Sequence, residues 1–209
     1  MAKRGTTEPG GGNKRRRVFD KAYYDRFYRD ADSCVTDAEI TGRLGAFVFG
    51  YLRHLDVDVR RVLDVGCGTG LWRDVLAHHL PEAEYTGVEI SDYLCRVYGW
   101  RQGSVVDFKT RGAFDLVVCQ GVLQYLSERD AREAIANLDR LCRGALYLEV
   151  LTREDWEGVC DRSVTDDQCY LREASWYRNR LGKYFTNCGG GVYLSKRSEH
   201  YVYALDRFD

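Results

Sequence analysis

Three glycines at alternate positions form the stretch of this sequence best suited to contacting a ligand. Gly66, Gly68 and Gly70 follow an apolar run that contains Asp64. Glycine tolerates positive φ and lets another molecule approach the main chain closely. The run before them is typical of a buried strand, and residues 71–80 have helical apolar spacing. A strand, a glycine turn and a helix in this order bind nucleotide-like ligands at the carboxyl end of an open α/β sheet.

The spacing of the glycines narrows the class of ligand. A dinucleotide fold has Gly-x-Gly-x-x-Gly, and a P-loop needs Gly-Lys-Ser/Thr, whereas this chain has Gly-x-Gly-x-Gly followed by Leu-Trp. The stretch resembles motif I of the class I S-adenosylmethionine-dependent methyltransferases. In that family the strand-end acid positions the loop and the ligand's amino group, and the loop passes beside the ligand's amino-acid tail. The resemblance therefore assigns cofactor binding to Asp64, Gly66, Cys67 and Gly68.

A carboxylate at the end of the next predicted strand, residues 84–90, extends the resemblance. Glu89 falls about 20 residues after the glycine loop, where a Rossmann-like fold places an acid that takes both ribose hydroxyls. A carboxylate suits this role because it offers acceptors to both hydroxyls. The resemblance then places Ile90 against adenine. The structural alternative is an ordinary strand-end carboxylate.

Two later segments complete the predicted cofactor site. Residues 103–107 read as the end of a third strand, and Ser104 stands where many relatives carry the aspartate that takes the adenine amino group. The serine hydroxyl can accept from that amino group, and the N–H of Val105 suits an adenine ring nitrogen. Phe-Asp-Leu-Val-Val within residues 113–120, followed by Gly-Val-Leu-Gln-Tyr-Leu, resembles motif IV of the family. This resemblance places Gln120 beside the methionine part of the cofactor.

The catalytic residue is less clearly marked than the cofactor site. Residues 18–29 are rich in aromatic side chains with helical spacing. In many small-molecule methyltransferases such a helix closes over the cofactor, which gives Tyr28 a cofactor contact and makes Tyr24 a candidate base. Glu149, toward the end of the predicted strand 145–150, is the other candidate base. The alternative for the aromatic residues is core packing.

The acceptor is predicted to bind between two weakly patterned segments, residues 18–36 and 152–177. Both mix aromatic rings with charged groups, which suits a flat or partly anionic molecule with Arg172 and Arg178 as possible partners. Residues 152–170 carry no apolar period and read as a loop or lid.

The elements around these residues predict the fold. Further helices are expected over residues 37–54, 127–141 and 176–185, and the last two strands over residues 191–195 and 201–205. The expected fold is α/β: a Rossmann-like seven-stranded sheet, mostly parallel with the last strand antiparallel, and helices on both faces.

Composition adds limits on domains, partners and compartment. The chain has 209 residues and a formal net charge of −1, so no global field drives it toward nucleic acid or membrane. Residues 1–17 are expected to be a disordered basic tail, and residues 18–209 a single methyltransferase domain with an amino-terminal helical cap. No signal-peptide core or apolar run of about 18 residues occurs, which favours a cytoplasmic protein. The eight cysteines lack Cys-x-x-Cys pairing, which favours reduced thiols and no metal.

The sequence therefore predicts an S-adenosylmethionine-dependent methyltransferase that acts on a small-molecule acceptor. An RNA or protein acceptor stays open through the basic tail, although nucleic acid is disfavoured. A nicotinamide-binding oxidoreductase shares the strand–glycine–helix unit and the ribose acid, and a non-catalytic binding module could keep the fold. The methylated atom, whether O, N or C, and the oligomeric state are left open.

Overall fold

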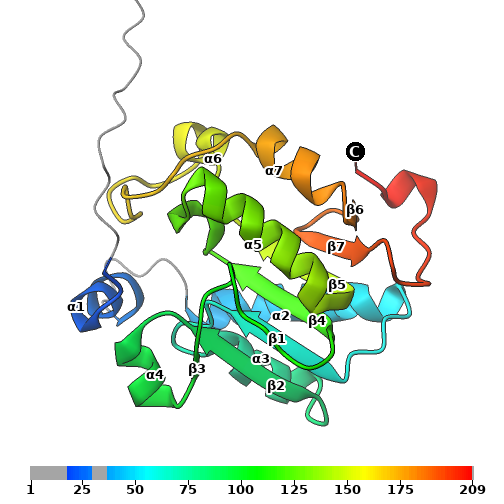
Figure 1. The fold of residues 1–209 in the computed structure, drawn as a ribbon, viewed down its shortest axis with the longest axis horizontal. Coiled ribbons are helices and arrows are strands. Elements are labelled where there is room, and N and C mark those ends of the chain that lie inside the picture. The colour runs from blue at the N-terminus through cyan, green and yellow to red at the C-terminus, as the bar shows by residue number, and fades with distance from the viewer. Residues whose placement is uncertain (1–17, 30–36, 209) are drawn as a thin grey trace, which may run out of the picture.

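The fold is centred on one seven-stranded sheet (Figure 1). The structure is a computed structural model that describes residues 18–29 and 37–208. The strands are β1 (Arg61–Val65), β2 (Glu84–Glu89), β3 (Arg101–Gln102), β4 (Phe114–Gln120), β5 (Cys142–Glu149), β6 (Phe185–Asn187) and β7 (Val192–Ser195). Their order is β3-β2-β1-β4-β5-β7-β6, and β7 is antiparallel to both of its neighbours. The other strand pairs are parallel, so the predicted fold class is confirmed.

The central strands are apolar because helices cover both faces of the sheet. The helices are α1 (Lys21–Tyr24), α2 (Ala38–His54), α3 (Leu71–His79), α4 (Asp92–Tyr98), α5 (Glu128–Leu141), α6 (Arg153–Gly158) and α7 (Ala174–Leu181), with a π-helical turn at Asp25–Arg29 and 3₁₀ turns at Leu123–Tyr125 and Ala204–Asp206. One core joins α2 and α3 to the sheet through Phe49 and Trp72. The other joins α5 and α7 to the opposite face through Leu138 and Leu181. Both helix pairs are visible on either side of the strands in Figure 1.

Two strand predictions were wrong. The third strand is the short β3, and residues 103–107 form a turn in which the Ser104 hydroxyl accepts the main-chain N–H of Val106 at 3.2 Å. That local bond competes with strand pairing. The region predicted as the last strand, residues 201–205, is not a strand and ends in a 3₁₀ turn.

The seventh strand comes instead from the end of the helix predicted over 176–185. Helix α7 ends at Leu181, and β6 pairs with β7 as a hairpin. Three consecutive glycines with positive φ lie between these strands: Gly189, Gly190 and Gly191. A Cβ at the last of them would lie 2.9 Å from the carbonyl oxygen of Leu148, so only glycine fits this approach of the hairpin to β5.

The predicted loop over 152–170 contains the short helix α6. Thr152 accepts the N–H of Asp155, and the Asp155 carboxylate accepts the N–H of Thr152 at 3.1 Å, which forms a capping box. The cap explains a helical turn without an apolar period. The tail predicted at residues 1–17 lies outside the described residues.

Within residues 18–29 and 37–208, no helix is long and apolar enough to cross a membrane. The same part of the chain holds no group of three His, Cys, Asp or Glu side chains arranged for a metal ion. Its seven cysteines are all free thiols.

Candidate active site

A pocket of about 1460 Å³ lies at the carboxyl ends of the central strands. The glycine loop after β1, the end of β2, the turn after β3 and the end of β4 form one side of it. The segment from Val18 to Tyr28 forms another side. Of the residues predicted from the sequence, those that line the pocket are Tyr24, Tyr28, Gly66, Gly68, Glu89, Ile90, Ser104, Val105 and Gln120.

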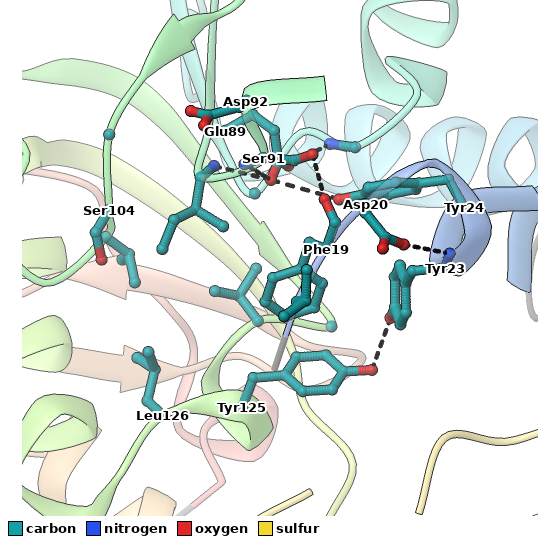
Figure 2. Close-up of a pocket in the computed structure, with 18 of the residues that line it drawn as sticks. Phe19, Asp20, Tyr23, Tyr24, Glu89, Ser91, Asp92, Ser104, Tyr125 and Leu126 are labelled. Carbon is teal, nitrogen blue, oxygen red and sulfur yellow. Dashed lines mark hydrogen bonds between the residues drawn. The ribbon is translucent and has the colours of Figure 1, made fainter. Parts of the chain in front are cut away.

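Glu89 is the most heavily bonded acid of the pocket (Figure 2). One carboxylate oxygen, Oε2, accepts the N–H of Gly68 at 3.0 Å. The other, Oε1, accepts the N–H groups of Ile90 at 2.8 Å and Ser91 at 2.9 Å, and the Tyr24 hydroxyl at 3.4 Å. The side chain is only 3% exposed. The acid therefore fixes the glycine loop to the end of β2 and keeps one acceptor position of Oε2 available.

The three loop glycines have different steric surroundings. A Cβ on Gly66 would lie 2.3 Å from the Val122 side chain, and one on Gly70 would lie 2.8 Å from the indole of Trp100. A Cβ on Gly68 would meet nothing closer than a main-chain oxygen 4.0 Å away. Gly66 and Gly70 are thus required by protein packing, whereas Gly68 leaves an open cradle in the pocket wall.

Two residues assigned to the cofactor, Asp64 and Cys67, support the loop from behind and do not line the pocket. Asp64 is 2% exposed, and its carboxylate accepts the Tyr85 hydroxyl at 2.7 Å. Burial raises the pKa of Asp64 to about 7, the Tyr85 hydrogen bond lowers it, and the charge of Glu89 adds to the rise. The Cys67 thiol lies 3.0 Å from the position of a Cβ on Gly87, and burial raises the pKa of this thiol.

The turn that carries Ser104 and Val105 is held by a residue that sequence reasoning missed. The Asn137 amide donates to the carbonyl of Val105 at 2.9 Å and to that of Phe108 at 3.0 Å. Asn137 is 3% exposed on α5. The available signal was an amide beside the apolar positions of a predicted helix, where a buried polar group needs partners.

A hydrogen-bonded chain fixes the side chain of Gln120. The Trp72 indole donates to Gln120 Oε1 at 2.7 Å, and Gln120 Nε2 donates to Glu149 Oε2 at 3.2 Å. The Tyr147 hydroxyl donates to the same Glu149 oxygen at 3.0 Å. Glu149, predicted as a base, is exposed and does not line the pocket. Its carboxylate orients Gln120, which does line it.

Aromatic residues of the amino-terminal segment close the other side of the pocket (Figure 2). The hydroxyls of Tyr23 and Tyr125 lie 3.0 Å apart in a hydrogen bond, and the rings of Phe19 and Tyr125 meet edge to face at 5.2 Å. The Ser91 hydroxyl donates to the Phe19 carbonyl at 2.5 Å. The segment is therefore tied both to the end of β2 and to the turn after β4.

The two tyrosines nearest the predicted ribose acid are poor bases. Burial, and then the negative charge of Glu89, hold the pKa of Tyr24 far above its ordinary value. The same two causes, in that order, raise the pKa of Tyr28 to about 12. Both phenols keep their protons at neutral pH and act as hydrogen-bond donors.

The predicted acceptor segment contributes Asp167, Gln168 and Tyr170 to the pocket. Arg172, predicted as a partner for an anionic molecule, is 8% exposed and already engaged. Its guanidinium donates to the carbonyls of Leu123 and Leu126 and to the Tyr177 hydroxyl. Arg178 lies exposed on α7 and does not line the pocket.

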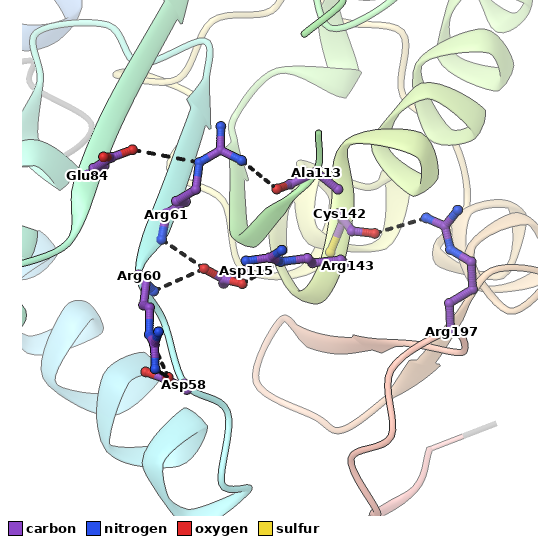
Figure 3. Close-up of polar contacts among 9 residues, drawn as sticks. All are labelled: Asp58, Arg60, Arg61, Glu84, Ala113, Asp115, Cys142, Arg143 and Arg197. Atoms are coloured by element: carbon purple, nitrogen blue, oxygen red, sulfur yellow. Dashed lines mark hydrogen bonds and ion pairs between the residues drawn. The ribbon is translucent and has the colours of Figure 1, made fainter. Parts of the chain in front are cut away.

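A second polar cluster, at the amino ends of the strands, has a structural role (Figure 3). Asp115 of β4 accepts the N–H groups of Arg60 at 3.0 Å and Arg61 at 2.9 Å, and the Arg143 guanidinium at 2.6 Å. Burial raises the pKa of Asp115, but the hydrogen bonds from Arg143, Arg61 and Arg60 outweigh it and leave the pKa below its usual value. The aspartate of the Phe-Asp-Leu-Val-Val stretch thus joins β1, β4 and β5 at the ends of the strands that lie away from the pocket.

Comparison with known protein families finds one matching stretch, and it contains both the glycine loop and residues 113–126. The family model of a methyltransferase domain matches residues 63–144. A malonyl-[acyl-carrier protein] O-methyltransferase of Legionella pneumophila is 31% identical over 113 residues, which cover 48% of this chain and 39% of that protein. A ubiquinone biosynthesis O-methyltransferase of Xanthomonas oryzae is 29% identical over 165 residues, covering 70% of this chain and 66% of that protein.

Solved structures share the fold. The plantazolicin methyltransferase BpumL, in complex with a pentazolic desmethylPZN analog and SAH, matches with a TM-score of 0.59 and 17% identity, over 78% of this chain and 66% of that one. The PH0226 protein of Pyrococcus horikoshii matches with a TM-score of 0.61 and 17% identity, over 84% of this chain and 97% of that one. The chain spans 24–45% of the length of the first three curated relatives it matches.

Proposed function

We propose that the chain is a class I S-adenosylmethionine-dependent methyltransferase and that it transfers a methyl group from S-adenosylmethionine to a small-molecule acceptor. The observation that carries the proposal is the pairing of an open cradle at Gly68 with the buried, loop-bound carboxylate of Glu89 in one pocket. Relatives named as O-methyltransferases support a small acceptor.

The pocket offers this cofactor open space beside Gly68 and hydrogen-bond acceptors on Glu89. The residues proposed to hold S-adenosylmethionine are Tyr28, Asp64, Gly66, Cys67, Gly68, Glu89, Ile90, Ser104, Val105 and Gln120. Glu89 would accept from the ribose hydroxyls, and the turn at Ser104 and Val105 would face adenine. Asp64 and Cys67 would act indirectly, because they hold the loop and do not line the pocket. When bound, the cofactor supplies a methyl group that its sulfonium already activates.

The chain's own contribution to the reaction is positioning and exclusion of water. The aromatic segment forms one wall of the pocket. Reactants held in the correct orientation have a lower activation barrier. The Tyr24 hydroxyl would donate a hydrogen bond to Glu89, the proposed ribose acid, and so orient its carboxylate. Glu149 would act as a positioning residue through Gln120, since its carboxylate is already shared between Gln120 and Tyr147. We therefore propose a mechanism in which geometry, more than a base, carries methyl transfer.

Calorimetry with S-adenosylhomocysteine and with NAD tests the proposal. We expect saturable binding of S-adenosylhomocysteine and none of NAD at the same concentration. Release of S-adenosylhomocysteine from S-adenosylmethionine, followed over a panel of small acceptors, then separates an enzyme from a non-catalytic binding module. Binding of NAD in preference to S-adenosylhomocysteine would refute the assignment and support the oxidoreductase alternative.

A further inference from the structure

The pocket has a half that the proposed cofactor contacts do not use. It is formed by the pocket-lining residues of the segments 18–23, 121–130 and 167–170, and we name it the acceptor half. Its walls carry the aromatic rings of Phe19, Tyr23, Tyr125 and Tyr170. Aromatic faces attract cations as well as apolar groups.

The charged side chains described as lining the acceptor half are all acidic. Asp20, Asp130 and Asp167 line it, and no lysine or arginine does among the described lining residues. Within the described part of the chain, none of these three carboxylates takes part in an ion pair. Among the described lining residues the one basic side chain is that of Arg96, which lies on α4 outside the acceptor half.

An acceptor oxygen without a donor lies behind the same wall. Gln124 is 8% exposed, and its Oε1 has no hydrogen-bond partner among the described residues. Its amide nitrogen lies 3.7 Å from the position of a Cβ on Gly121, which lines the pocket. Buried oxygens of this kind normally have a donor. Gln124 thus adds, next to this part of the pocket, an acceptor that lacks a donor among the described residues.

From these observations we infer that the acceptor molecule carries an ammonium group, bound between the tyrosine rings and the carboxylates of Asp130 and Asp167. The inference rests on the proposed function, because it assigns this half of the pocket to the methyl acceptor. It also explains the engagement of Arg172: with its guanidinium bonded to main-chain carbonyls, the adjoining segment presents no arginine to an anionic acceptor. A positively charged acceptor would then bind more tightly than one that carries a carboxylate.

The test compares three ligands that share one ring and differ in charge: tyramine, the neutral alcohol tyrosol and 3-(4-hydroxyphenyl)propionate. Each is titrated into the full chain saturated with S-adenosylhomocysteine, at low and at high salt. We expect tyramine to bind at least about tenfold more tightly than the propionate at low salt, with tyrosol between them and the gap narrowing as salt screens the carboxylates.

Charge-removing variants locate the effect. The double variant Asp130→Asn/Asp167→Asn should lose most of the tyramine preference and keep its affinity for S-adenosylhomocysteine. The control Glu82→Gln/Glu199→Gln removes the same charge from exposed positions outside this pocket and should keep the preference. Failure of the parent to bind S-adenosylhomocysteine overturns the proposed function. Two results would overturn the ammonium inference alone. The first is normal S-adenosylhomocysteine binding in a parent that does not prefer tyramine, either because none of the three ligands binds or because the propionate binds equally well. The second is a tyramine preference that survives in the double aspartate variant.

Discussion

Glu89 accepts four hydrogen bonds, so its carboxylate shapes the glycine loop as well as facing the pocket. We expect Glu89→Gln to weaken S-adenosylhomocysteine binding by about 2 kcal/mol, because a charged acceptor is lost and an amide N–H₂ faces donors. Calorimetry measures the change. Asp107→Asn is the matched control, since Asp107 lines the same pocket but is exposed. Equal losses in both variants would mean that Glu89 contributes only general charge.

Gly68 and Gly99 share a positive φ and open space at the Cβ position, but only Gly68 lines the pocket. Valine at either position should cost a similar amount of stability, roughly 1–2 kcal/mol from the left-handed backbone. We expect Gly68→Val to abolish S-adenosylhomocysteine binding while Gly99→Val retains it. Thermal melts report the shared cost and calorimetry reports the difference. Retained binding in Gly68→Val would show that the ligand does not approach this loop.

Asp64 makes stability depend on pH. Burial raises the pKa of Asp64 to about 7, against 3.8 for an ordinary aspartate. The folded state therefore holds the proton more tightly, so stability from this group is full below about pH 4, falls between about pH 4 and 7, and stays low above. The cost at alkaline pH reaches about 4 kcal/mol at most.

Asn at position 64 keeps an acceptor for the Tyr85 hydroxyl without the ionisation. We expect Asp64→Asn to gain stability relative to the parent as the pH rises from 5 to 8, measured as the free energy of urea unfolding at each pH. The same variant should bind S-adenosylhomocysteine less tightly if Asp64 organises the loop electrostatically. A difference between variant and parent that is independent of pH would show that Asp64 is ionised at both values.

At the scale of elements, α5 supports the adenine side of the proposed site through Asn137. Replacing Asn137 with Ala leaves the carbonyls of Val105 and Phe108 without their donor, which should cost roughly 1–3 kcal/mol of folding free energy. We also expect weaker S-adenosylhomocysteine binding, because the turn that carries Ser104 loses its support. Asn179→Ala on the exposed side of α7 should change neither quantity. If Asn137→Ala lowers stability alone, the turn does not contact the ligand.

Elements with long or periodic apolar runs could be predicted from the sequence. The runs of β1 and β4 lie where the pattern placed them, and so does α5, which was expected over residues 127–141. Elements whose identity depends on distant partners could not. Strand β6 has three residues and forms because glycines return the chain onto β7. Helix α6 was missed for a different reason, because its signal is a local capping box and not an apolar period.

The candidate site divides in the same way. Glycine spacing and strand-end position marked Gly68 and Glu89, because main-chain approach and a ribose acid leave local signatures. The residues that hold the site in place are remote in sequence from the residues they bind. The Trp72 indole donates to Gln120, and the Trp100 indole donates to the Gly68 carbonyl at 2.9 Å. A single sequence carries no signal for such pairs, so their roles emerged only from the fold.

At the scale of the whole molecule, the amino ends and the carboxyl ends of the strands have separate roles. The amino ends of the strands are joined by Asp115 and the arginines around it, and the carboxyl ends open into the pocket. The amino-terminal segment forms one wall of this pocket. Its rings pack on Leu94, which is fully buried, so this wall belongs to the folded core.

Two truncations separate this wall from the tail that precedes it. Removal of residues 1–17 should leave the melting temperature and the affinity for S-adenosylhomocysteine unchanged, because this basic, glycine-containing stretch has no apolar run to bury in a core. Removal of residues 1–28 takes away the aromatic wall and exposes Leu94, so we expect a lower melting temperature and much weaker S-adenosylhomocysteine binding. If the shorter truncation instead lowers methyl transfer at low salt, and neither excess acceptor nor excess cofactor restores it, the basic tail recruits the acceptor. Such a result would favour a nucleic-acid substrate over a small molecule, because low salt strengthens the contacts between basic side chains and nucleic-acid phosphates.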